Sequence, residues 1–262
     1  MIDMIVHYVS LLGTFVIHLC AILGKFLLFF IKTIKTAVTT TLKVHKTFVQ
    51  MNRIGVESIN IIVLTGLFTG MVLALQTYIG FQRVGGEQLI GAIVALGVIR
   101  ELGPVLTGLM VTGRAGSAIT AEIGTMIITE QIDALRTLRI NIYQYLIVPR
   151  IIASTFILPF LTVFSMIFGI IGGYIVCVHV LELSPEDYEN SIRNYVELAD
   201  IRGGLIKSSV FGLLLSWVGT YKGIYTYGGA RGVGIATTQS VVAGSILILI
   251  ANYFLTKLLE HL

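Results

Sequence analysis

Two adjacent ionisable residues, Arg100 and Glu101, lie in the middle of a long apolar stretch, directly before Gly103-Pro104. Charged groups are costly inside a membrane, so they usually face protein or a water-filled cavity and mark functional positions. Arg100 carries a permanently charged, planar guanidinium that matches phosphate oxygens bidentately. These residue types therefore predict the binding of an anionic group within an apolar environment.

Arg100 and Glu101 cannot simply pair with each other, because adjacent residues on a helix point about 100° apart. Each needs another partner or a wet cavity. They are either structural, bonded to neighbouring helices, or they face a polar cavity that meets lipid headgroups. In the preceding apolar segment, Gln76 could add hydrogen bonds to such a cavity or bond to another helix. Leu73 could line an acyl-chain path or face the bilayer. The hypothesis of a lipid-binding cavity thus rests on Leu73, Gln76, Arg100 and Glu101.

A second group of polar residues, from Glu122 to Arg136, lies between two apolar segments. Spacings of three and four residues place most of them on one stripe of a helix. A short amphipathic helix between two spans is typical of a docking surface, and the alternative is a solvated loop helix without a partner. The predicted docking residues are Glu122, Thr125, Thr129, Glu130, Asp133 and Arg136.

Other site chemistries are missing from the sequence. The five histidines are scattered without metal-ligand spacing, and no serine lies in a G-x-S-x-G elbow. The stretch from Gly203 to Ser208 resembles a phosphate loop, but Ile206 replaces the glycine that should precede the lysine. We therefore expect no catalytic residue, no metal and no enzyme activity in this chain. If ATP drives the protein, ATP and Mg²⁺ bind to a separate ATPase.

The composition is that of an integral membrane protein. Of the residues, 55% are hydrophobic and 12% are charged, whereas soluble domains carry about 25% charged residues. The net charge of +4 is modest, and we interpret it as a topology signal rather than as a sign of nucleic-acid binding. Cys20 and Cys177 lie in apolar segments, so no disulfide is expected. No cleaved signal peptide is expected either.

Five segments are long and apolar enough to cross a bilayer. They are residues 54–80, 89–113, 146–180, 203–227 and 239–259. The connection 32–53 carries five basic residues and no acid, which indicates a cytoplasmic location, whereas 181–202 is acidic. We therefore place 32–53, 114–145 and 228–238 inside, and 81–88 and 181–202 outside. Before the first span, residues 4–31 are apolar but are interrupted by His7, His18 and Lys25, which allows either a span or an interfacial helix.

Several motifs, in one order along the chain, resemble those of the MlaE/YrbE-type permeases, the membrane subunits of MCE-associated lipid ABC transporters. The resemblance runs from about Arg53 to Leu259. Its motifs are the docking segment and residues 100–107, 113–118, 149–150, 206–208 and 232–238.

The resemblance implies a fold, an activity and a set of partners. The fold would be an all-α membrane protein, with an N-terminal interfacial helix, five transmembrane helices and a cytoplasmic coupling helix between the second and third. One permease domain would cover 1–262, with the helix and basic segment in 1–52 and the transmembrane core in 53–262. The implied protein is a homodimer in the bacterial inner membrane that transports phospholipid and maintains outer-membrane lipid asymmetry. Its implied partners are a cytoplasmic ABC ATPase, a periplasmic MCE-domain protein and, in some systems, a STAS-domain protein.

Residue by residue, Gln76, Arg100 and Glu101 match cavity positions in that family, and 122–135 match the coupling helix. The chain has Asn252 where relatives often carry Asp, which puts in doubt a pair between Lys207 and a carboxylate across the last two spans. We expect Lys207 to extend to the outer headgroups and Asn252 to hydrogen-bond across helices.

Two other classes of function compete with this interpretation. One is an ATP-independent secondary transporter or channel, although the chain has few intramembrane charges and lacks the inverted repeat that such transporters often show. The other is a membrane-embedded lipid enzyme, which would need a nucleophile or a metal cluster that the sequence does not offer.

Overall fold

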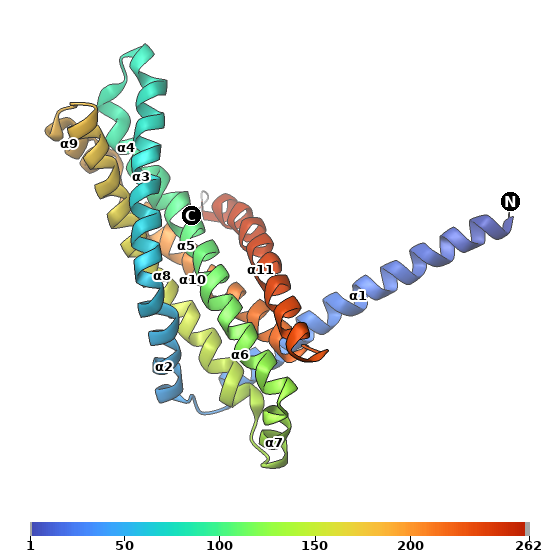
Figure 1. Ribbon diagram of the computed structural model, residues 1–262. Coiled ribbons are helices and arrows are strands. Elements are labelled where there is room, and N and C mark those ends of the chain that lie inside the picture. The colour runs from blue at the N-terminus through green and yellow to red at the C-terminus, as the bar shows by residue number, and fades with distance from the viewer. Residues whose placement is uncertain (1, 260–262) are drawn as a thin grey trace.

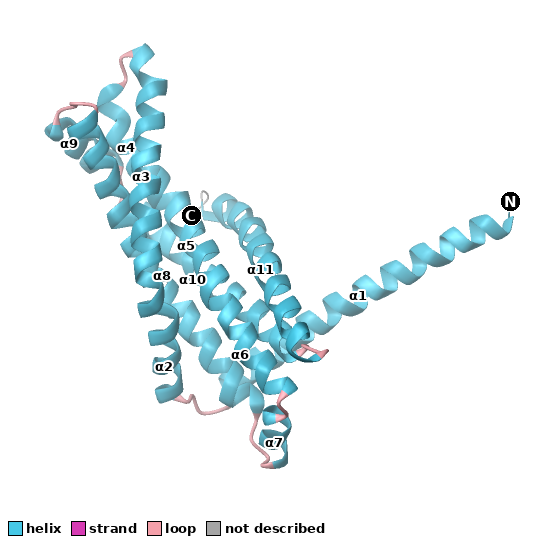
Figure 2. Cartoon of the chain, viewed as in Figure 1, coloured by secondary structure: helices cyan, strands magenta, loops and turns pink. Residues whose placement is uncertain are grey.

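The computed structural model describes residues 2–259, without the side chains of 2–12, 15, 19 and 84, so the side chain of His7 lies outside the described part. Within this range the chain is almost entirely helical and contains no strand (Figure 2). In this described part of the chain, six helical stretches are long and apolar enough to cross a membrane. They are Val16–Thr39, Val44–Phe81, Glu87–Ile128, Tyr143–Val180, Leu198–Ile224 and Gly229–Leu259.

Three of these stretches are composite helices. The first joins α2 (Val44–Gly55) to α3 (Ile59–Phe81) through one 3₁₀ turn. The second contains α4 (Ile90–Gly97), α5 (Gly103–Val111) and α6 (Ser117–Ile128), separated by π turns at Val98–Leu102 and Thr112–Gly116. The third is α8 (Val148–Ile175) with a π turn at each end. The remaining helices are α1 (Ile2–Thr39), α7 (Gln131–Thr137), α9 (Pro185–Tyr195), α10 (Leu198–Ile224) and α11 (Gly229–Leu259).

The composite helices form the long axis of the molecule, and α10 and α11 pack along one half of it (Figure 1). At one end, here called the α9 end, α9 covers the start of α4. The Tyr188 hydroxyl anchors α9 by donating to the carbonyl of Ile170 (3.0 Å), and burial raises the pKa of Tyr188. At the opposite end, here called the α7 end, lie α7 and the start of α2 (Figure 1). The connections that the sequence predicts on opposite sides of the membrane thus lie at opposite ends of the bundle (Figure 1).

The helix α1 leaves the bundle at a wide angle (Figure 1). The C-terminal half of α1 packs against the other helices. There Phe26 stacks on Trp217, Phe30 contacts the same ring, and Phe29 meets Tyr221. The fold is therefore an N-terminal helix that diverges from a five-helix membrane bundle, as expected. The predicted basic connection 32–53 is largely helical, because α1 continues to Thr39 and α2 begins at Val44.

Glycines allow the composite helices to approach closely. A side chain at Gly70 would overlap the carbonyl of Gly169, and one at Gly172 would overlap the carbonyl of Leu67. Membrane helices pack through such small residues because the surrounding lipid is as apolar as their side chains. The contact between α3 and α8 fixes the long axis on which the charged residues of the bundle are placed.

Three predicted boundaries are wrong. The second span does not end at Gly113, because the π turn at Thr112–Gly116 continues the helix to Ile128. The glycine-rich segment 228–238, predicted as a connection, is helical from Gly229 onward. The fourth span starts at Leu198 rather than at residue 203, because Glu197 and Asp200 form a capping box there.

The α3–α8 contact predicts unequal effects of two glycine substitutions on the same helix. Gly70→Ala should destabilise the protein by about 1–3 kcal/mol, because the new methyl group overlaps backbone that cannot easily move. A side chain at Gly80 would meet nothing within 4 Å, so Gly80→Ala should change stability by less than about 0.5 kcal/mol. Thermal unfolding of both variants in detergent measures the difference, and equal losses would contradict close backbone packing.

Candidate functional site

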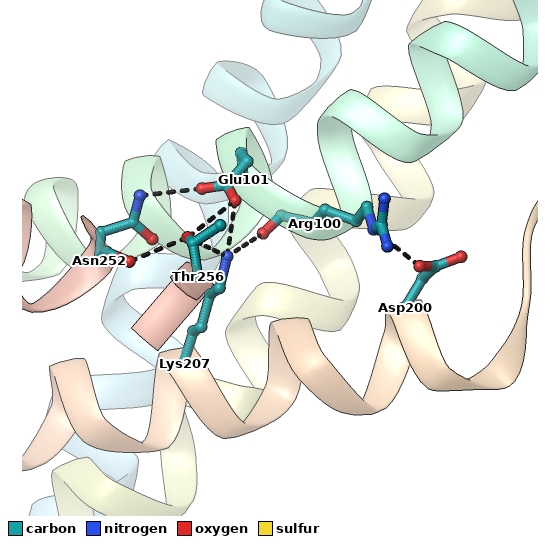
Figure 3. Close-up of polar contacts among 6 residues, drawn as sticks. All are labelled: Arg100, Glu101, Asp200, Lys207, Asn252 and Thr256. Atoms are coloured by element: carbon teal, nitrogen blue, oxygen red, sulfur yellow. Dashed lines mark hydrogen bonds and ion pairs between the residues drawn. The ribbon is translucent and has the colours of Figure 1, made fainter. Parts of the chain in front are cut away.

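A charged cluster lies inside the bundle where α10 and α11 cross the π turn between α4 and α5 (Figure 3). The Lys207 side chain is 5% exposed. Its ammonium donates to Glu101 Oε1 (2.7 Å), to the Arg100 carbonyl (2.9 Å) and to Thr256 Oγ1 (2.8 Å). An ammonium has three N–H groups, so the buried charge of Lys207 is fully hydrogen-bonded.

The Arg100 carbonyl can accept this bond because of Pro104. In an α-helix the carbonyl of residue 100 would accept from the N–H of residue 104, and proline has none. The π turn at Val98–Leu102 lies at the same place. The sequence thus leaves a backbone acceptor inside the membrane, and Lys207 satisfies it.

Glu101 completes the cluster. Its Oε2 accepts from Asn252 Nδ2 at 2.8 Å, and Thr256 Oγ1 lies 3.0 Å from its Oε1. Lys207 and Glu101 cancel in charge, and the amide of Asn252 adds a hydrogen bond without adding another charge. The expectation that Lys207 extends to headgroups is wrong, because its carboxylate partner comes from the second span. The expected cross-helix hydrogen bond of Asn252 is confirmed.

Arg100 points to another partner, as the angle between adjacent residues predicts (Figure 3). Its Nε lies 2.8 Å from Asp200 Oδ1. The other carboxylate oxygen of Asp200 accepts the backbone N–H of Glu197, which caps α10. Asp200 is buried, but the Arg100 side chain remains 58% exposed. A membrane helix thus presents an oriented guanidinium that is still accessible from outside the chain.

Leu73 and Gln76, the other two predicted cavity residues, lie on α3. Leu73 is half-buried and packs against the cluster that contains Val98 and Ile99, beside the π turn of Arg100. Gln76 is exposed one turn farther toward the α9 end. The structure brings Leu73 near the helix segment of Arg100, and a lipid-contacting role for the four residues stays a prediction.

A second charged cluster ties the helices together near the α7 end. Glu122 bridges Arg150 (2.8 Å) and Arg53 (3.3 Å), and thereby links α6 to α8 and α2. Arg114, in the second π turn, binds Glu57 at 3.1 Å and donates to the Arg53 carbonyl. Glu122 is therefore a bonded member of this cluster with 41% of its side chain exposed, and its docking role stays a prediction.

The predicted docking segment is divided between two helices. The helix α6 ends at Ile128, and Glu130 adopts a left-handed conformation (φ 57°) before α7 begins. In α7 the buried Ile132 anchors the helix to the core, whereas Asp133 and Arg136 pair on the exposed face (2.8 Å). Thr125, Thr129 and Glu130 are also exposed. The exposed residues of the predicted docking segment thus extend from Thr125 to Arg136, and Glu122 is partly exposed beside them.

Sequence reasoning did not name Asp200 or Thr256 as site residues, and it named Arg150 only within a family motif. Glu197 and Asp200 lie at the start of an apolar run, and acidic residues at such a position indicate the start of a helix. This signal could have placed Asp200 in α10. The pairing of Thr256 and Arg150 depends on how distant helices meet, and spacing along the chain does not indicate it.

The Lys207 cluster predicts a compensating pair of substitutions. Lys207→Met should destabilise the protein by about 2 kcal/mol, less than a fully buried pair would lose, because the Glu101 side chain is 38% exposed. The double variant Lys207→Met/Glu101→Gln should recover much of the loss, because it leaves no uncompensated charge. Thermal unfolding in detergent of both single variants and the double variant gives the coupling energy, and additive losses would contradict the pair.

Comparison with known proteins agrees with this architecture. The family described as Permease MlaE matches residues 47–258. A probable ABC transporter permease protein of Rickettsia bellii is 42% identical over 97% of this chain and 98% of its own length. The intermembrane phospholipid transport system permease protein MlaE of Haemophilus influenzae is 36% identical over 98% of both chains. The chloroplastic protein TRIGALACTOSYLDIACYLGLYCEROL 1 of Arabidopsis thaliana is 39% identical over 82% of this chain and 62% of that protein. The chain belongs to the MlaE permease family.

Proposed function

We propose that this protein is the membrane subunit of an ABC-type phospholipid transporter, and that it contributes Leu73, Gln76, Arg100 and Glu101 to a lipid-binding cavity. The observation that carries the proposal is the exposed guanidinium of Arg100, held by Asp200 within a membrane helix. A charged group in that position needs water or an anionic partner, and a phospholipid phosphate supplies the anion. The name of the Haemophilus relative supports phospholipid as the cargo.

The proposed cavity keeps its two charges in different roles. Arg100 offers N–H groups to a phosphate, because one ion pair occupies its Nε and more than half of its side chain is exposed. Glu101 is engaged by Lys207, Asn252 and Thr256, so it repels an incoming phosphate less than a free carboxylate would. Leu73, beside this turn, offers apolar surface to an acyl chain.

The proposal includes a separate ATPase at the α7 end. The exposed face of α7 and the turn before it would receive the ATPase, while Ile132 ties their movement to the core. ATP and Mg²⁺ would bind to that partner. The basic residues of α1 and α2 support a cytoplasmic location for this end, in the inner membrane of a bacterium.

The further proposed partners follow from the family. A second copy of the chain would complete the cavity, and α11 offers it an exposed apolar face with Val242, Ile246, Leu249 and Tyr253. An MCE-domain protein would meet the α9 end, and a STAS-domain protein would join the ATPase. The proposed physiological role is the maintenance of outer-membrane lipid asymmetry.

Photo-crosslinking tests the cavity. Probes at positions 73 and 76 should form adducts with phospholipid in the intact complex. Arg100→Gln should reduce the adduct yield by at least about tenfold, because it removes a charge-assisted phosphate contact worth about 1.5–3 kcal/mol. Asp200→Asn is the matched control, because it weakens the same ion pair but leaves the guanidinium and a helix-capping side chain. Equal loss of complex in both variants, with unchanged adducts per folded protein, would contradict the lipid-binding role and favour a structural one.

Charge reversal on α7 tests the docking surface. Asp133→Lys or Glu130→Lys should lower co-purification of the ATPase and ATP-driven lipid transport, while the permease remains inserted, because both carboxylates are on the exposed surface. Glu189→Lys, an exposed reversal on α9 at the opposite end, is the control and should leave ATPase association unchanged. Full ATPase association and full lipid transport in both α7 variants would refute the docking role. Lipid transport in the absence of any ATPase would favour a secondary transporter instead.

A further inference from the structure

We infer that a pocket at the α7 end binds a phosphate group, at a site separate from Arg100. The pocket encloses about 320 Å³ between α2, α6 and α8. This volume is at the lower end of the range for small-ligand pockets, roughly 300–1,000 Å³. A phospholipid headgroup and free phosphate share the chemistry that such a pocket would recognise.

The charges of the lining favour an anion. Three basic side chains line the pocket, Lys46, Arg53 and Arg150, against one carboxylate, Glu122. The lining therefore has an excess of two positive charges, three minus one. His45 adds a ring that can donate a hydrogen bond.

The positive groups are held in place before any ligand arrives. The Arg150 side chain is 4% exposed, and its two terminal nitrogens bind Glu122 (2.8 Å) and the Leu146 carbonyl (2.7 Å). Arg53 reaches the same carboxylate through Nη1 and is 55% exposed, so it retains N–H groups for a ligand. Lys46 lies over the ring of Tyr145, with its Nζ 2.9 Å from the ring centroid. Such preorganisation lowers the entropy cost of binding.

The surroundings favour a lipid as the source of the phosphate. On α2, Lys46, Val49, Gln50 and Arg53 recur at helical spacing and line the pocket. Exposed apolar side chains, Val44 and Phe48, occupy the adjoining face of the same helix. Basic groups beside exposed apolar surface are typical of the membrane interface, where headgroup phosphates lie.

The pocket is remote from Arg100. Arg114, which donates to the backbone of Arg53, is fourteen residues beyond Arg100 on the same composite helix (114 minus 100). At 1.5 Å per residue this is about 21 Å along the axis. The inference therefore goes beyond the proposed transport cavity and does not depend on transport.

A photoreactive residue at position 49 tests the site in the full-length permease, assembled with its ATPase in nanodiscs that contain phosphatidylglycerol. Lys46→Gln, Arg53→Gln and the near-isosteric Gln50→Glu should each lower the yield of lipid adducts about fivefold, the effect of roughly one interfacial charge. Lys35→Gln, which removes an exposed charge on α1 outside the pocket, should leave the yield unchanged.

A second arm distinguishes the source of the phosphate. Titration of the delipidated complex with inorganic phosphate should show binding that the same three variants weaken. Charge-dependent adducts support a lipid headgroup, and charge-dependent titration without adducts supports free phosphate. The inference is overturned if neither signal differs between the pocket variants and Lys35→Gln, or if position 49 crosslinks to the ATPase instead of lipid. Gln50→Glu keeps the test decisive should the loss of Arg53 impair folding.

Discussion

A buried ammonium in an apolar bundle must find three acceptors, and this requirement governs the centre of the structure. Lys207 obtains them from a carboxylate, a hydroxyl and a backbone carbonyl that Pro104 leaves free. These partners lie on two other helices, so satisfying one charge fixes how α10 and α11 cross the helix that carries Glu101. Removing any one partner would leave a buried polar group unpaired, which costs more than the bond itself contributes.

Polar groups lie at two depths of the same long helix, and apolar packing separates them. The π turn at Val98–Leu102 carries Arg100 and Glu101, and the π turn at Thr112–Gly116 carries Arg114. Between them, Val111 is buried in the core, and Val105 and Leu109 pack against it. The helix α5 joins these two turns directly. It therefore connects the proposed docking surface at the α7 end to the turn that holds Arg100 through continuous helix.

The sequence predicts the class of the fold, because hydropathy reports directly on length and apolar content. The number of bundle helices and the separation of their connections were confirmed, whereas the ends of the helices were not. The second predicted span ends at Gly113 and Gly229 lies in a predicted connection, but the helix continues through Gly113 and α11 begins at Gly229. Glycine is common within membrane helices, so it does not by itself mark their ends. Charge within an apolar stretch indicated Arg100 and Glu101 as candidates, and periodicity indicated the residues that lie on the exposed face of α7. It could not identify Asp200 and Thr256 as partners, because such pairing is decided by tertiary contacts between helices far apart in sequence.

The Lys207 cluster also constrains the biogenesis of the protein. Synthesis runs from the N-terminus, so Glu101 enters the membrane more than one hundred residues before Lys207 and about one hundred and fifty before Asn252. The stretch that carries Lys207 has the lowest hydropathy of the six that could cross the bilayer. Its insertion is therefore favoured by the Glu101 carboxylate, which is already in the membrane. The helix α11 then inserts and adds Asn252 and Thr256 to the cluster. The positions of these residues along the chain thus favour one order of assembly, in which the helix of Glu101 inserts first, α10 second and α11 last.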